Sequence, residues 1–125
     1  MYEGTWRHDK REGFGRQIDE RGNVYEGDFM DDVMEGVGQL RNLEAGVTYE
    51  GRWKKGKQHG FGVESWEDGS TFEGEFREGM KNGKGIFKWN NGSTYQGEFK
   101  ADQIDGYGVY LWDDGRKYQG GWKDN

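Results

Sequence analysis

The sequence predicts an all-β protein built from stacked β-hairpins, and three observations predict it. Aromatic residues and glycines recur together every 23 or 24 residues along the chain. Within each unit, aromatic residues and glycine alternate with other residues, which is typical of strands that are buried on one side. Glycines also interrupt every window in which a helical period of 3.6 residues could be sustained, so we expect almost no helix.

The repeat is defined by columns of residues that share one position in every unit. Taking the first aromatic residue as position zero, glycine recurs two residues later and a second aromatic residue four residues later. A Gly-x-Gly pair follows at positions 11 and 13, and a turn glycine closes the unit. The first column consists of Tyr2, Tyr25, Tyr49, Phe72, Tyr95 and Tyr118.

The columns organise the whole chain, 1–125, as a single repeat array. Because a stack of repeats normally needs capping and neither end shows a cap, we expect the array to be part of a longer chain or to pair with another chain. The repeats are 2–24, 25–48, 49–71, 72–94 and 95–117, followed by a partial sixth repeat, 118–125.

Each repeat contains two predicted strands. The first is the aromatic-x-Gly-x-aromatic stretch, for example 49–53. The second starts at the Gly-x-Gly pair and runs, in the last three full repeats, to Trp66, Trp89 or Trp112, which leaves a loop between the two strands. Asp-Gly or Asn-Gly then gives a strong hairpin-turn signal, as at Asp68 and Gly69.

The pairing register depends on the length of that turn. A three-residue loop at 67–69 would place Gly60 opposite Phe76 and Gly62 opposite Gly74, so that a flat ring could lie over bare backbone. A two-residue turn would shift the pairing by one and move these residues to opposite faces. We favour the first register because it explains why glycine and aromatic columns occur together.

The composition excludes several classes of protein. The chain has 24 glycines, no proline and no cysteine, which rules out disulfides and thiolate metal sites. A net charge of −6 disfavours non-specific nucleic-acid binding. No apolar run approaches the roughly 18 residues of a membrane span, and no signal peptide opens the chain.

No arrangement of residues indicates catalysis, so we expect no enzymatic activity, no cofactor and no metal. The two histidines, His8 and His59, lie about two repeats apart at different positions of the repeat. The Gly-x-Gly pairs do not continue into a nucleotide-binding loop, and Gly83-Lys84-Gly85 lacks the spacing of a P-loop. No serine lies in a G-x-S-x-G setting.

The third repeat, Tyr49-Glu50-Gly51-x-Trp53-x-x-Gly56-Lys57-x-His59-Gly60-x-Gly62 closed by Asp68-Gly69, closely resembles the MORN repeat (membrane occupation and recognition nexus). The resemblance covers the whole chain and implies an elongated, single-layer antiparallel sheet of hairpins, curled with a groove. It also implies a non-enzymatic scaffold or protein–protein interaction module. Some units depart from the pattern: the first repeat has Asp19 where the third has Trp66, and the second has Asp32 in place of Gly56.

The resemblance further implies a cytoplasmic protein associated with the cytoskeleton, cilium or membrane. Two alternatives remain open. One is a phospholipid-binding membrane tether, and the other is a regulatory repeat array of a larger enzyme. A homodimer through array ends or edges is also plausible.

The candidate partner-binding residues fall into two groups. Alternate positions of the second strands form a face for a protein or peptide partner, unless they are the buried lining of the curled sheet: Phe14, Phe61, Val63, Ile86, Tyr107 and Val109. Apolar residues also occur in segments between strands that we expect to be wet, where they either fill gaps or add to a contact surface: Met30, Val33, Met34 and Ile104.

Charge patterns add two weaker hypotheses. The acidic column that begins Glu3, Glu26, Glu50 and Glu73 is more typical of a solvated face than of an acidic docking strip. The two densest basic clusters, Arg7, Lys10 and Arg11 and then Lys54, Lys55 and Lys57, are both smaller than the groups of about 4–8 Lys/Arg that recognise anionic lipids. We therefore expect direct phosphoinositide binding to be weak.

Overall fold

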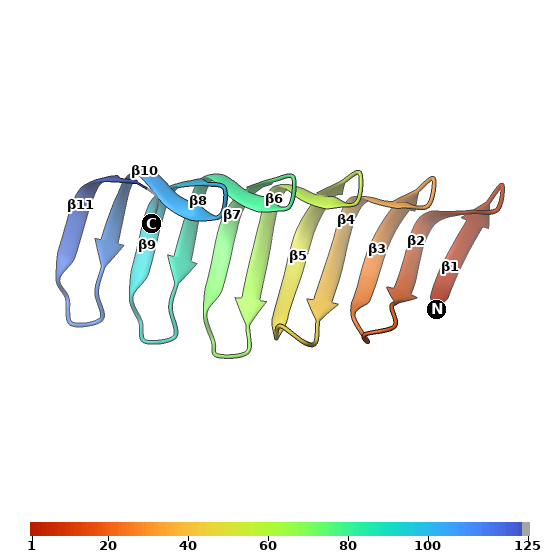
Figure 1. Cartoon of the computed structure of the whole chain (residues 1–125), viewed down its shortest axis with the longest axis horizontal. Helices are drawn as coiled ribbons and strands as arrows, with labels where there is room; N and C mark the ends of the chain where they lie inside the picture. The colour runs from red at the N-terminus through yellow and green to blue at the C-terminus, as the bar shows by residue number, and fades with distance from the viewer. Residues whose placement is uncertain (124–125) are drawn as a thin grey trace.

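The computed structural model describes residues 1–123, which form one open antiparallel sheet of eleven strands. The strands hydrogen-bond in the order in which they occur in the chain, and Figure 1 shows the hairpins side by side in one long row. The predicted all-β array of hairpins is thus confirmed, while the last two residues of the partial sixth repeat, 118–125, lie outside the described residues. The strands are β1 (Tyr2–Arg7), β2 (Lys10–Ile18), β3 (Val24–Met30), β4 (Val33–Asn42), β5 (Val47–Lys54), β6 (Lys57–Trp66), β7 (Thr71–Arg77), β8 (Met80–Lys88), β9 (Thr94–Lys100), β10 (Gln103–Leu111) and β11 (Lys117–Trp122).

The turns between repeats confirm the predicted register. Trp66 N–H donates to the carbonyl of Ser70 at 2.9 Å, which encloses a three-residue loop, and Gly69 in that loop has a φ of +95°. Gly60 then pairs with Phe76, and the two glycines 62 and 74 lie opposite each other.

The turns within repeats differ from the prediction, because the strands continue where a loop was expected. Only two residues connect β5 to β6, and both have positive φ, +51° at Lys55 and +81° at Gly56, as in type I′ hairpin turns. From the second repeat on, each such turn is also held by the preceding hairpin: Gly56 N–H, for example, donates to the carbonyl of Met34 at 2.9 Å. Met30, Val33, Met34 and Ile104 accordingly all lie in strands, whereas the sequence prediction placed them between strands. Met34 and Ile104 also pack against the core.

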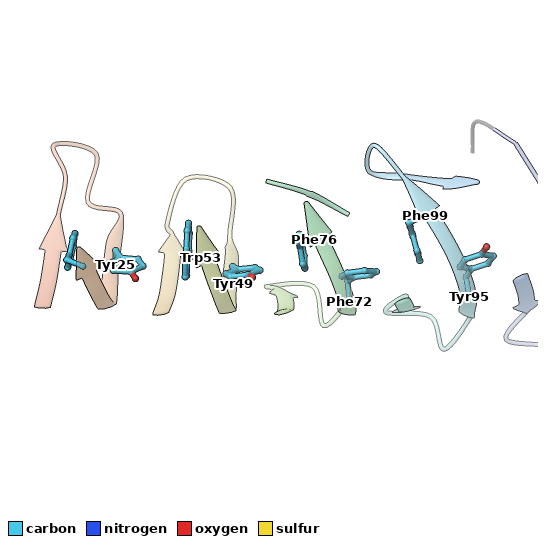
Figure 2. Close-up of a cluster of buried hydrophobic side chains, with 8 residues drawn as sticks. Tyr25, Tyr49, Trp53, Phe72, Phe76, Tyr95 and Phe99 are labelled. Atoms are coloured by element: carbon cyan, nitrogen blue, oxygen red, sulfur yellow. The ribbon is translucent and has the colours of Figure 1, made fainter. Parts of the chain in front are cut away.

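The core is a continuous file of aromatic rings on one face of the sheet. The ring at position zero of a repeat packs edge-to-face on the second aromatic residue of its own repeat and on that of the next. The ring centroid of Phe72, for example, lies 5.4 Å from that of Phe76 and 5.0 Å from that of Phe99, with interplanar angles of 89° and 80°. Figure 2 shows this alternation along the array. Because every ring is shared, neighbouring repeats stabilise each other.

The second glycine of each Gly-x-Gly pair lies beneath a ring of this file. A Cβ atom on Gly85 would come within 2.5 Å of two ring carbons of Phe72, so only hydrogen fits there. The first glycine has a different role from the one predicted. Although Gly60 pairs with Phe76, the atoms nearest a Cβ there belong to Arg52, and the residue has a φ of +82°.

This positive φ occurs at a β-bulge that bends every hairpin. Between the pairs Gly51–Gly62 and Trp53–Gln58, one residue of β5 faces three of β6. Bulges increase twist and bend the strand that carries them. In Figure 1 the ends of the hairpins that carry the two-residue turns fold over relative to the rest, and the sheet is therefore curled.

The tyrosines of the file satisfy their hydroxyl groups locally. Tyr49 Oη donates to the carbonyl of Arg52 at 2.8 Å, and Tyr25 and Tyr95 make the same bond to the residue three positions later. Burial raises the pKa of Tyr49 to about 12, with a further contribution from the negative charge of Glu64.

Candidate functional site

The face opposite the aromatic file carries a large, open hollow. Phe61 on β6 pairs with Glu75 on β7, and the strand alternation of β7 directs Glu75 away from the core rings Phe72 and Phe76. The equivalent position in repeat five is Tyr107. Both aromatic side chains remain 57% and 56% exposed, respectively, so the sheet itself does not bury them.

We call this hollow the repeat 3–5 groove. It has a volume of about 860 Å³ and spans β6 to β10. Its floor is largely glycine backbone, which leaves the hollow open between the side chains that stand on either side. Its lining includes apolar side chains from Phe61, Ile86, Tyr107 and Val109 and charged side chains from Glu73, Glu75, Glu98 and Lys84.

The groove is acidic, with three carboxylates against one ammonium group among these residues. Two carboxylates also have a structural role at the bulge. Glu75 Oε1 accepts a hydrogen bond from the backbone N–H of Lys84 at 3.2 Å, and Glu98 Oε1 accepts one from Tyr107 N–H at 2.7 Å. Glu73 makes no such bond within residues 1–123, so its full charge faces the groove.

The structure gathers four of the ten predicted site residues in this groove: Phe61, Ile86, Tyr107 and Val109. Phe14 occupies the same repeat position as Phe61 and is 64% exposed, but it lies two repeats away and outside the groove. Val63 shares the face, since it pairs with Glu73, but it does not line the hollow. The exposure of Phe14, Phe61 and Tyr107 shows that these aromatic side chains are not a buried lining.

The second predicted group is divided between surface and core. Met30 is 55% exposed next to the two-residue turn between β3 and β4. Val33 and Met34 line another, smaller hollow on the aromatic face. Ile104 packs against the core file, as Met34 also does.

Sequence reasoning missed the acidic residues at position three of the repeat. Asp28, Glu75 and Glu98 share this position, and each accepts a hydrogen bond from a backbone N–H of the bulge in the following strand. Their recurrence at one offset was the signal that could have identified them.

Residues 1–123 contain no group of three or more His, Cys, Asp or Glu side chains placed to hold a metal ion. Within the same range, no helix is long and apolar enough to cross a membrane.

The fold and the groove define a class of protein, a single-layer array of β-hairpin repeats that offers an open face for binding. The MORN repeat family matches five segments that together span most of the chain: residues 2–24, 25–41, 49–71, 72–94 and 95–115. The chain therefore belongs to the MORN-repeat family, whose repeats are in general protein or membrane interaction modules.

A solved structure with a similar fold is the SAS-4 (dCPAP) TCP domain of Drosophila melanogaster, in complex with a proline-rich motif of Ana2 (dSTIL). The two share 13% sequence identity and superpose with a TM-score of 0.55. The match covers 86% of this chain and 59% of the other, so the chain spans less than two thirds of the length of its structural neighbour. At this identity the similarity concerns the fold alone.

Proposed function

We propose that the chain is a non-enzymatic scaffold module that binds an extended, basic segment of a partner protein along the repeat 3–5 groove, in cytoskeletal, ciliary or membrane-proximal assemblies. The observation that carries this proposal is the groove itself, in which exposed aromatic side chains flank a glycine floor. Clusters of apolar side chains around a concave surface, with a few charged groups, are typical of binding sites. The structural neighbour, which binds a proline-rich motif, supports peptide binding in general.

Charge favours a basic partner. Glu73, Glu75 and Glu98 lie along the groove, and Lys84 is the one cation among its lining residues. Complementary charge mainly accelerates association and selects among partners, so binding should weaken as salt rises. An extended segment fits the open, elongated hollow better than a folded domain does.

The test is a selection of binding peptides with matched variants. A display library of natural peptide segments is selected on the wild-type protein, and affinities are then measured by fluorescence anisotropy. Phe61→Asp and Tyr107→Asp should each reduce the affinity of the selected basic peptides at least tenfold. Phe14→Asp is the matched control, because it makes the same change at the same repeat position outside the groove, and it should leave the affinity unchanged.

Charge is tested separately with Glu73→Gln, which leaves the bulge hydrogen bonds intact and should lower the affinity and its salt dependence. Circular dichroism confirms that each variant folds. Selected peptides that bind the folded Phe61→Asp and Tyr107→Asp variants as tightly as wild type would exclude the groove as the binding site.

The alternative function, a phospholipid-binding membrane tether, would use the turn between β5 and β6. Lys54, Lys55 and Lys57 are all exposed there. We expect their contribution to be weak, because anionic lipids are recognised by clusters of roughly 4–8 cations. Saturable binding to phosphoinositide vesicles at physiological salt, lost when the three lysines are replaced, would support the tether instead.

A further inference from the structure

A second hollow opens on the aromatic face, over the junction of the first two repeats. Its volume is about 320 Å³, and β2, β3 and β4 provide most of its lining. Tyr25, Phe29, Met34 and Leu40 form apolar walls, and Asp19 lies among the polar residues of its lining. The residues are on the opposite face from the repeat 3–5 groove, since Leu40 pairs with the core residue Tyr25 and Met34 with Phe29.

The hollow lies where the first repeat has Asp19 in place of tryptophan, while the turn backbone at this point is the same as in later repeats. Asp19 N–H donates to the carbonyl of Asn23 at 3.0 Å, and Trp66 N–H donates to the carbonyl of Ser70 at 2.9 Å. Gly22 N–H donates to the carbonyl of Asp19, just as Gly69 N–H donates to the carbonyl of Trp66, and both distances are 3.1 Å. Asp19 therefore occupies the backbone position that tryptophan occupies in repeats three to five.

In the later repeats, an indole fills the corresponding space. Trp66 packs on Phe87 with ring centroids 5.4 Å apart, and the Lys81 ammonium lies 5.4 Å from its ring centre. Phe87 and Lys81 stand at the repeat positions of Leu40 and Met34, the walls of the hollow. The next junction repeats the arrangement, with Trp89 lying 5.1 Å from Tyr110.

The charges at the hollow are unevenly satisfied. Arg11 Nε donates to Asp32 Oδ1 at 3.1 Å, and its Nη1 donates to Gln17 Oε1 at 3.1 Å. Asp19 accepts hydrogen bonds from its own turn at both oxygens, from Arg21 N–H and Asn23 N–H at Oδ1 and from Asn23 Nδ2 at Oδ2, but it forms no ion pair with any residue of 1–123. A ligand that enters the hollow would thus meet an apolar slot with an unpaired negative charge beside it.

We propose that this hollow binds a tryptophan side chain of a partner protein segment that carries lysine or arginine next to the tryptophan. The indole replaces the side chain that the first repeat lacks, and the neighbouring cation pairs with Asp19. The site is independent of the repeat 3–5 groove, because the two lie on opposite faces and share no lining residue.

The test uses three capped tripeptides and methyl NMR spectra of the intact chain. Lys-Trp-Lys should shift the methyl resonances of Met34 and Leu40 saturably, with a dissociation constant of about 1 mM. Lys-Ala-Lys should leave them in place, and Glu-Trp-Glu should bind at least fivefold more weakly.

Two variants place in the hollow the residues that later repeats carry at the same positions. Asp19→Trp fills the hollow with the side chain that the same backbone already holds elsewhere, and it should abolish the Lys-Trp-Lys shifts. Leu40→Phe narrows the slot with the residue found at this position in repeat four and should weaken binding at least threefold, which keeps the test valid if Asp19→Trp folds poorly.

Three results would overturn the proposal. The first is no saturable shift in the wild-type protein, and the second is an equal response to Lys-Ala-Lys, which would show attraction by charge only. The third is concentration-dependent self-association that disappears in both Asp19→Trp and Trp6→Ala. That result would assign the hollow to Trp6 of a second copy, since this residue is 59% exposed.

Discussion

Replacing Gly85 with alanine should test whether the glycine columns exist to accommodate the aromatic file. A methyl group at this position would lie 2.5 Å from two ring carbons of Phe72. The ring of Phe72 has no free space to move into, because it is fully buried and packs edge-to-face on Phe76 and Phe99, with ring centroids 5.4 Å and 5.0 Å away. Either the backbone moves or the ring leaves its edge-to-face contacts.

The expected magnitude follows from these contacts. Overpacking typically lowers the free energy of unfolding by about 1–3 kcal/mol. Displacing the ring would weaken two edge-to-face pairs, each contributing about 0.5–1.5 kcal/mol, which gives a similar range. Alanine recovers roughly 0.5–1 kcal/mol over glycine within a strand. We therefore expect Gly85→Ala to lower the free energy of unfolding by about 1–2 kcal/mol.

The assay is equilibrium unfolding in urea, followed by tryptophan fluorescence and circular dichroism, with midpoints compared at equal m-values. Gly121→Ala is the matched control, because a Cβ atom there meets nothing within 4 Å, and the change should be neutral or slightly stabilising. In a Phe72→Leu background the loss caused by Gly85→Ala should shrink, since the two side chains compete for one space. If Gly85→Ala is as harmless as Gly121→Ala, the packing explanation of the glycine columns is wrong.

Three further predictions concern single side chains. Tyr49→Phe should reduce the loss of stability in alkali, as urea midpoints at about pH 9 and 11 will measure. The pKa of Tyr49 is about 12 in the folded chain against roughly 10 in the unfolded chain, so the contribution of this hydroxyl to the free energy of unfolding is complete below about pH 10 and is lost as the pH rises through 12. Lys81→Met should lower the free energy of unfolding by about 2–4 kcal/mol, because Lys81 and Glu64, 3.2 Å apart, are only 13% and 14% exposed, whereas the Lys81→Met/Glu64→Leu double variant should regain most of it. Arg52→Glu should raise the melting temperature and add about 0.5–1.5 kcal/mol to the free energy of unfolding, because a carboxylate there can accept a hydrogen bond from Phe61 N–H, as the equivalent glutamates do in repeats four and five. A lower melting temperature would contradict this role.

The register and the aromatic core could be predicted because both follow from local signals. The Asp-Gly turn at Gly69 fixes a three-residue loop, and period-two alternation then assigns the rings to one face. The two-residue turns were missed because their sequences lack Asn-Gly. Ala101 and Asp102 both adopt positive φ, at +50° and +70°, and the preceding hairpin holds the turn through a bond from Asp102 N–H to the carbonyl of Lys81 at 3.0 Å.

The sites depend on contacts between repeats, which a single repeat does not reveal. Phe61 and Tyr107 could be assigned to one face by alternation, but the hollow between them also needs side chains from the intervening strands, such as Glu75, Lys84 and Glu98. The Asp19 substitution is visible in the sequence. Its consequence depends on Met34 and Leu40, which belong to the next repeat and reach the same space only in the folded sheet.

The sharing of each ring between two repeats makes the length of this protein an adjustable quantity. If residues 72–94 were deleted, Tyr49 would meet Phe99 in place of Phe76, and every kind of contact in the file would survive. Deletion of half a repeat would instead bring unlike strands together and end the file. Duplication or loss of whole units therefore preserves the aromatic file, so evolution can change the reach of the array, and the number of sites along it, while keeping this part of its core.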